Sequence, residues 1–227
     1  MYIFPMGLIA ASLSSGTIDG VSYSMFEPNS KVYSKKNYNI LVTAYQNQTL
    51  LTRKKSDPFL TIHYDYENIF TREFRQIEHF VEKKEDALNT FFAVDWSAGI
   101  TPSGIANSSG DWIVSITNTK LYSSTANMKS NRAFVWNGSS FKEGPITSVS
   151  TNVSVTVDVD TSNYGNLTLA NAQSGGIIYP LYECYLIPGS IGNFESTNFI
   201  PNHSISLSED GGYMYSGSLS LVTKYKV

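Results

Sequence analysis

Apolar and polar residues alternate along much of the chain, and a period of two predicts short β-strands. The alternation is clearest from residue 59 to residue 66, where one set of alternate positions is apolar or aromatic and the other is polar. The first set is Leu60, Ile62, Tyr64 and Tyr66, and the second is Thr61, His63 and Asp65. We therefore predict a half-buried strand, with one face on a core and the other face polar.

The residues that follow have a helical period. Large apolar side chains recur at spacings of three or four, at Phe70, Phe74, Ile77 and Val81, and Phe80 widens the stripe. The remaining positions are polar and include Arg72, Arg75, Gln76, Glu78 and Lys83. The pattern predicts one amphipathic helix between Phe70 and Leu88, packed on a sheet. A short apolar strand, from Phe91 to Val94, is expected after it.

Further strand patterns lie on both sides of this segment. Residues 39–45 and 49–52 flank Gln46-Asn47-Gln48, which predicts a hairpin. We expect Ser56-Asp57-Pro58 to end its second strand, because proline cannot donate to a β-ladder. Turn-forming residues are frequent from 97 to 109, which predicts a domain boundary. Beyond it, short strand patterns are expected at 112–116, 132–136, 144–146, 153–159, 175–187 and 213–222, a spacing typical of a small barrel or sandwich.

The composition and net charge limit the kinds of molecule that the chain is expected to bind. The 227 residues include 15% charged residues, below the ~25% that is usual for soluble domains. Sixteen basic and nineteen acidic side chains give a net charge of −3. The clusters Arg53-Lys54-Lys55 and Lys83-Lys84 are too short to predict a nucleic-acid groove. A weakly charged, tyrosine-rich surface suits either a chain in contact with other proteins or an ordinary β-sandwich.

The single cysteine and the apolar runs bear on where the chain is made. Cys184 is the only cysteine, so no intrachain disulfide can form, which fits synthesis in the cytosol. Residues 1–13 lack a basic start and a continuous apolar run, so we expect no signal peptide. No stretch approaches ~20 apolar residues, so no membrane-spanning helix is expected.

The candidate chemistry is sparse. His63, His79 and His203 each lack a neighbouring nucleophile motif, and we expect them to be surface residues. Cys184 lies in an apolar strand pattern, which favours a buried structural thiol. Asp158-Val159-Asp160-Thr161-Ser162 resembles a calcium loop only in its acidic spacing. The carboxylates Asp65, Glu67, Asp95 and Asp111 have nothing to pair them as a glycosidase would require. We therefore predict no catalytic, cofactor-binding or metal-binding residues and no enzyme activity.

The order of elements resembles the distal tail proteins of long-tailed bacteriophages. The resemblance starts with an aromatic strand, the pattern Thr71-Arg72-Glu73-Phe74-x-x-Ile77-x-x-Phe80, and Phe91-Phe92-Ala93-Val94-Asp95. Later segments are similar to the second, barrel-like domain of that family: Asn131 to Trp136 and Pro145 to Val149. The segments Ile178-Tyr179-Pro180-Leu181-Tyr182 and Gly211-Gly212-Tyr213-x-Tyr215-x-Gly217 resemble strands that return to its first domain. The resemblance extends from about Asn39 onward and leaves residues 1–20 unmatched.

The resemblance implies a mainly β protein with one α-helix. It implies a β-sandwich with a helix, formed by residues 1–97 with 190–227, that carries an inserted barrel-like domain at 98–189. It further implies a structural virion protein of the tail tip: a homohexameric ring that joins the tail tube protein to hub and fibre proteins. DNA would pass through the lumen without specific binding, and no membrane would take part. Residues 1–20 would then be an arm that reaches a neighbouring subunit.

Two other functions remain open on the sequence. Trp112, Trp136, Tyr164 and Tyr213 could stack on sugar rings if exposed, which would make the chain a carbohydrate- or receptor-binding module of a phage tail. The alternative is that these aromatics fill a core. A hydrolase with an unrecognised site is the third hypothesis.

Overall fold

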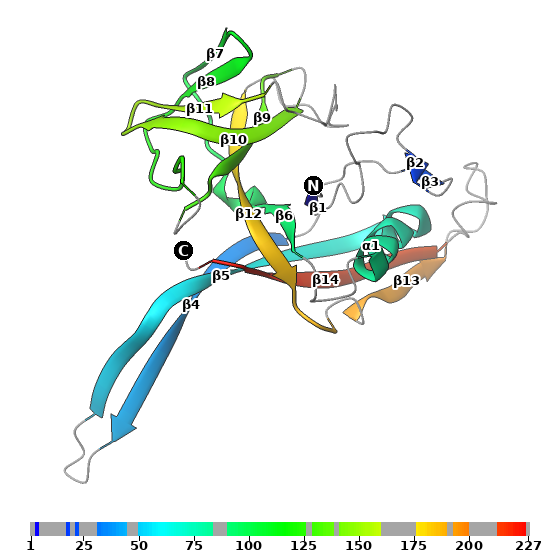
Figure 1. Ribbon diagram of the computed structural model, residues 1–227. Coiled ribbons are helices and arrows are strands. Elements are labelled where there is room, and N and C mark those ends of the chain that lie inside the picture. The colour runs from blue at the N-terminus through cyan, green and yellow to red at the C-terminus, as the bar shows by residue number, and fades with distance from the viewer. Residues whose placement is uncertain are drawn as a thin grey trace.

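A computed structural model describes the chain at residues 3–4, 17–18, 21–22, 31–44, 50–83, 90–125, 129–138, 141–159, 176–189, 193–199 and 213–225 (Figure 1). These residues are mainly β, as predicted, and contain one α-helix, α1 (Thr71–Lys83), and one 3-10 turn, η1 (Trp96–Ala98). The strands are β1 (Ile3–Phe4), β2 (Thr17–Ile18), β3 (Val21–Ser22), β4 (Lys31–Ala44), β5 (Leu50–Phe70), β6 (Phe91–Val94), β7 (Gly104–Ser108), β8 (Asp111–Ser115), β9 (Arg132–Trp136), β10 (Phe141–Ser150), β11 (Ser154–Asp158), β12 (Ile177–Leu186), β13 (Glu195–Phe199) and β14 (Tyr213–Thr223).

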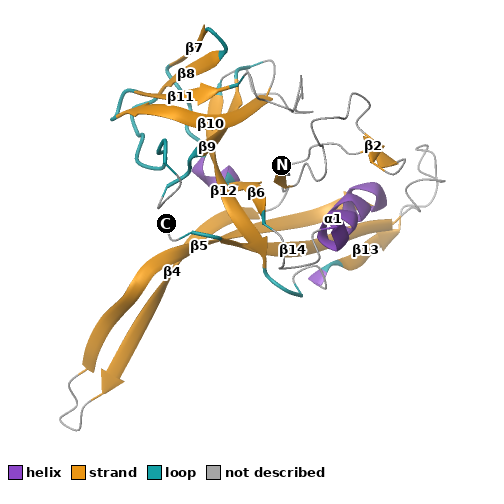
Figure 2. Cartoon of the chain, viewed as in Figure 1, coloured by secondary structure: helices purple, strands orange, loops and turns teal. Residues whose placement is uncertain are grey.

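Twelve of the described strands are connected in one sheet. Its main order is β4-β5-β14-β12-β9-β10-β11-β8-β7, with β6 beside β12, β1 beside β6, and β13 beside β14. Neighbours in it are antiparallel except for β1 and β6. Figure 2 shows the sheet bending so that β7 to β11 lie above and β4, β5 and β14 lie below, with β12 running between them.

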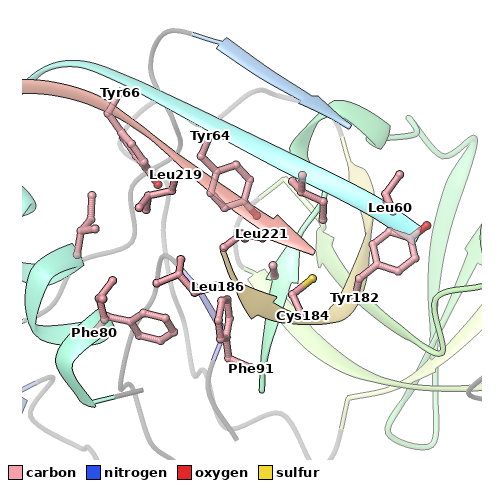
Figure 3. Close-up of a cluster of buried hydrophobic side chains, with 14 of the residues drawn as sticks. Leu60, Tyr64, Tyr66, Phe80, Phe91, Tyr182, Cys184, Leu186, Leu219 and Leu221 are labelled. Carbon is pink, nitrogen blue, oxygen red and sulfur yellow. The ribbon is translucent and has the colours of Figure 1, made fainter. Parts of the chain in front are cut away.

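The first core lies between the lower strands and α1. The alternation in β5 is confirmed, because Leu60, Ile62, Tyr64 and Tyr66 are all buried in this cluster. From α1, Ile77, Phe80 and Val81 enter the same core, and Phe74 packs at its edge. The ring of Phe80 meets that of Phe91 edge-on, at 4.9 Å between centroids (Figure 3). At about 2 kcal/mol for each buried large side chain, this stripe fixes the helix to one face of the sheet.

The second core lies among β8 to β11. Its largest members are Trp112 and Tyr122, and the alternating valines of β11, Val155 and Val157, face them. Strand β12 contributes to both cores, with Ile178 in the second cluster and Tyr182, Cys184 and Leu186 in the first. The two cores therefore share one continuous strand. The division into residues 98–189 and the remainder stays a prediction.

Polar contacts join the two cores where β12 passes between them. The hydroxyl of Ser130 accepts from the amide of Leu181 at 3.0 Å and donates to its carbonyl at 2.6 Å. The guanidinium of Arg132 lies 2.6 Å from the buried carboxylate of Glu143 and 5.5 Å from the centre of the Phe92 ring. Burial raises the pKa of Glu143, and the charge of Arg132 opposes that shift. Because these contacts link β9 and β10 with β6 and β12, they fix the position of the second core relative to the first.

One sequence prediction about a strand end was wrong. Ser56-Asp57-Pro58 does not end a strand, because β5 runs unbroken from Leu50 to Phe70. The register with β4 shifts between Asn37 and Asn39, and Asp57 and Pro58 fall inside that bulge. A bulge leaves a backbone amide out of the ladder, which is where a strand accepts proline.

The turn-forming segment 97–109 contains a strand that its local sequence did not predict. Ile100 bridges Ile178 of β12, and residues 104–108 form β7, which pairs in full with β8. Small polar residues suit this strand because most of its side chains are exposed at the edge of the sheet. Cross-strand pairing has therefore overridden the local turn preference.

Gly144 permits a close approach of two strands and gives a stability test. A Cβ atom at this position would lie 1.7 Å from the carbonyl oxygen of Asp158, which is backbone and cannot swing away. We expect Gly144→Ala to lower the free energy of unfolding by about 3 kcal/mol, measured by urea denaturation. Gly104→Ala is the matched control, because that position has no atom within 4 Å. Equal stability of the two variants would contradict the described approach of β10 to β11.

Candidate assembly surface

The sheet formed by β4, β5, β14 and β12 has two unlike faces. One face carries the first core and α1. The other presents the alternate residues, and we call it the outer face: Tyr33, Lys35, His63, Ser220, Val222 and Tyr185. None of these six is fully buried, and Tyr33 is 40% exposed. Thr61, on the same face of β5, is buried and accepts a hydrogen bond from the side-chain amide of Asn37. The described residues therefore form a sheet that is covered by a helix on one side only.

A cross-strand row lies at the centre of the outer face. Tyr33 and Ser220 are the register partners of His63 on its two sides. The Tyr33 ring stacks on the imidazole at 4.5 Å, and the Ser220 hydroxyl lies 2.8 Å from Nδ1. Partial burial and the charge of Lys35 lower the pKa of His63, against the raising effect of Asp65. The histidine is therefore neutral at neutral pH, and the row carries no charge.

The charges at the β12 end of this face are satisfied within the chain. Oε1 of Glu183 accepts from Nζ of Lys224 and from the hydroxyl of Thr90, each at 2.7 Å. The pair is partly exposed, so it contributes little to stability. The pair adds no net charge to this face.

The contact between Ser220 and His63 also raises the question of catalysis. A serine beside a histidine is the minimal nucleophile and base, but acyl transfer also needs oxyanion donors in a water-excluded site. This pair lies on the open face of a sheet, beside the exposed Tyr33 and Lys35. The position fits a cross-strand polar contact better than a catalytic dyad.

The other candidate residues are spread over the molecule. Asp65 and Glu67 lie on β5, Asp95 is buried after β6, and Asp111 lies on β8 in the second part. Asp111 is the register partner of Asp158, while residues 160–162 of the possible calcium loop lie outside the described residues. Within the described ranges, no group of three or more His, Cys, Asp or Glu side chains could hold a metal ion.

The remaining histidines and the cysteine complete the candidates. The side chain of His79 and the whole of His203 lie outside the described residues. Cys184 is fully buried, and burial raises the pKa of its thiol. The prediction of a buried structural thiol is confirmed. The described part of the chain has no helix of the length and apolarity that a bilayer crossing requires.

No protein-family model and no curated protein matches this chain.

The tryptophans do not form a sugar-binding platform. Trp112 is 5% exposed and Trp136 is 2% exposed, so of the two alternatives for them, filling a core is the one that holds. Neither ring is available to stack on a sugar. Tyr213 is 49% exposed, and Tyr164 lies outside the described residues.

A long two-stranded arm extends from the same sheet. Strand β5 pairs with β14 only as far as Thr61, opposite Val222. From Thr61 to Leu50, at about 3.3 Å per residue, it continues for about 35 Å with β4 as its one described partner. We call residues 39–44 and 50–56 the arm, and Figure 1 shows it projecting away from both cores. An isolated two-stranded hairpin is marginally stable in water, so this arm gains from a partner surface.

A buried carboxylate ties the root of the arm to the body. Oδ1 of Asp95 accepts from the amide of Ser97 at 3.1 Å and from its hydroxyl at 2.5 Å. The Ser97 hydroxyl lies 3.3 Å from that of Ser34 in β4. Burial raises the pKa of Asp95, while the hydrogen bonds from Ser97 and Ser34 lower it. Asp95 therefore joins β6, η1 and β4 at the place where the arm leaves the body.

The raised pKa of Asp95 makes the protein less stable when this carboxyl ionises. A raised pKa means that the folded chain binds the proton more tightly than the unfolded chain, so this contribution to stability is lost as pH rises through the folded pKa. Asp95→Asn keeps an acceptor oxygen and removes the charge. We expect its melting temperature to exceed that of the wild type at pH 7.5, with the difference shrinking toward pH 4.

Differential scanning calorimetry across this pH range measures the effect. Asp95→Ala serves as the control, because it removes both the charge and the acceptor and is expected to be less stable than Asp95→Asn at every pH. A melting temperature for Asp95→Asn below that of the wild type at pH 7.5 would show that the charged form is favoured.

Proposed function

We propose that this chain is a structural virion protein of a phage tail tip. In this proposal, identical copies form a ring, six being the expected number, that connects the tail tube to the hub and to fibre or receptor-binding proteins. Residues 1–97 with 190–227 form the ring, as a sandwich-like sheet with its helix, and residues 98–189 form a peripheral barrel-like insert. The arm and the outer face are the observations on which the proposal rests.

The open edges of the sheet support assembly from identical copies. Among the described strands, β4 pairs only with β5, and β13 pairs only with β14. An unpaired edge as long as β4 invites association, and monomeric proteins usually shorten or cover such edges. With β7, which pairs only with β8, the described sheet has several different edges, and different edges on one chain favour head-to-tail contacts that close into a ring when the rotation between copies allows it.

The outer face is suited to line the ring. Its central row is uncharged, and the chain as a whole has a net charge of −3. Of the six residues that define this face only Lys35 is a cation, so the face would hold a phosphate backbone weakly and let DNA pass. On the opposite face, α1 covers the sheet and would lie toward the outside of the ring.

Size-exclusion chromatography with light scattering tests the proposal. With a chain of 25.1 kDa, we expect a discrete species at a whole-number multiple of that mass, six copies in the expected ring. The dilution series runs from about 100 μM to 1 μM to find the association range. A monomer at every concentration and salt condition would exclude a ring. A tape-measure or tail-tube gene beside the gene for this chain would independently support the tail-tip assignment.

A further inference from the structure

The turn η1 holds two buried polar groups that their surroundings satisfy only in part. Asp95, directly before η1, is 2% exposed, and its carboxylate accepts hydrogen bonds from Ser97. Nε1 of Trp96, within η1, is also buried, and no described residue accepts a hydrogen bond from it. A buried donor without an acceptor is costly, and so is a buried carboxylate without a cation. An opening of this turn to water would relieve both costs.

The titratable groups around Asp95 offer it no positive charge. Burial raises the pKa of three tyrosines and a cysteine near this carboxyl, and the charge of Asp95 raises each further: Tyr64 of β5, Tyr182 and Cys184 of β12, and Tyr122. All four are therefore neutral when the carboxyl ionises. Burial raises the pKa of Asp95 itself, and the described groups that oppose this shift are the donors Ser97 and Ser34, not cations.

The backbone on both sides of η1 is fixed to β12. The amide of Asp95 donates to the carbonyl of Pro180 at 3.0 Å, and the amide of Ile100 donates to the carbonyl of Ile178 at 2.9 Å. Between these two points, the described backbone hydrogen bond is the local one from the amide of Ala98 to the carbonyl of Asp95, at 3.1 Å. The turn can therefore open between two fixed ends and leave the pairing of β12 intact.

A small number of side-chain contacts hold the turn closed. The Trp96 ring meets those of Phe134 and Tyr179 edge-on, at 6.0 Å and 4.9 Å between centroids. Ser97 is exposed, and its hydroxyl lies 3.3 Å from that of Ser34 in β4. Because the segment is short and partly exposed, its opening requires less free energy than global unfolding.

We propose that η1 is a proton-controlled switch, closed on β4, β9 and β12 while Asp95 carries a proton and locally open once Asp95 ionises. The closed turn binds the proton more tightly than the open turn, since only the open turn exposes the carboxylate to water. Opening therefore increases as pH rises through the pKa of the closed state. Acid holds η1 against the root of the arm, and neutral pH releases it. The inference does not depend on the proposed ring.

Hydrogen exchange measured by mass spectrometry on the full chain tests the switch. The reporter peptide covers the amides of residues 97–100, and the reference peptide covers β8 in the second core. Asp95→Asn removes the charge and keeps an acceptor. Glu78→Gln is the matched control, because it neutralises an exposed carboxylate on α1. Gly99→Ala should hold the turn open, because a Cβ atom there would lie 2.5 Å from the Tyr179 ring.

Exchange rates are compared between chains at the same pH, so that the chemical pH dependence of exchange cancels. From pH 4.5 to pH 8, we expect the ratio of the wild-type rate to the Asp95→Asn rate to rise about threefold or more in the reporter. The same ratio should stay constant in the reference. Glu78→Gln should follow the wild type, and Gly99→Ala should exchange rapidly in the reporter at both pH values. Circular dichroism melting curves confirm that each variant folds.

Four results would overturn the inference. A reporter ratio that stays constant or falls with pH would show that Asp95 does not open the turn. An equal rise in the reference would show that the whole fold is loosened. If Glu78→Gln removed the pH dependence as Asp95→Asn does, net charge would be the cause. If Gly99→Ala protected the reporter as well as the wild type does, the closed turn would not pack on Tyr179.

Discussion

Shortening the arm is expected to abolish assembly and to leave the fold intact. Asn39 and Ser56 are register partners, so replacing residues 40–55 with Asn-Gly closes the hairpin at that pair through a two-residue turn. The replaced residues include the far ends of β4 and β5 and the Arg53-Lys54-Lys55 cluster. Light scattering should then report monomers at concentrations where the full chain forms rings, with a melting temperature within about 4 °C of the wild type.

A second variant controls for the loss of the loop residues 45–49, which the shortened chain also lacks. It keeps both strands of the arm and replaces residues 45–49 with a glycine- and serine-rich loop of equal length. This chain is expected to assemble as the wild type does, because β4 and β5 keep their pairing. Rings formed by the shortened chain would show that the arm is dispensable, and the edges of the sheet alone would then have to explain association.

Phe80→Ala is expected to give the largest loss of stability among single truncations on the helix. The Phe80 side chain is 1% exposed and packs edge-on against Phe91, so the deletion removes contacts and leaves a cavity between α1 and β6. We expect the free energy of unfolding to fall by about 3 to 5 kcal/mol, measured by equilibrium urea denaturation.

Two comparisons make that result interpretable. Phe80→Leu retains most of the volume and is expected to lose about 1.5 kcal/mol or less. Val153→Ala truncates a residue that is 60% exposed and is expected to change stability by about 0.5 kcal/mol at most. If Phe80→Ala were as mild as Val153→Ala, α1 would not be packed on the sheet as described.

Local periodicity predicted the parts of the fold that depend on one element at a time. The alternation from Leu60 to Tyr66 placed one face of β5 in a core, and the helical spacing identified the side chains of α1 that face inward. Cys184 was expected to be buried because its neighbours are apolar, and it is. In each case, the residues that decide the outcome are neighbours in sequence.

The candidate surface depends on residues that are far apart in sequence. Tyr33, His63 and Ser220 form one row only because β4 and β14 flank β5, and no local pattern specifies those neighbours. The length of the arm was missed because Ser56-Asp57-Pro58 has the composition of a strand end, whereas the structure uses it as a bulge. Trp112 and Trp136 were ambiguous for a similar reason: an aromatic in a strand faces a core or solvent according to what packs on it.

Electron cryomicroscopy of the purified protein at assembly concentration tests the central claim most directly. We expect closed rings in which the open edge of β4 is covered and the arm of each copy contacts the next copy. Isolated particles of one chain, or assemblies whose arms project into solvent without touching a neighbour, would contradict the account.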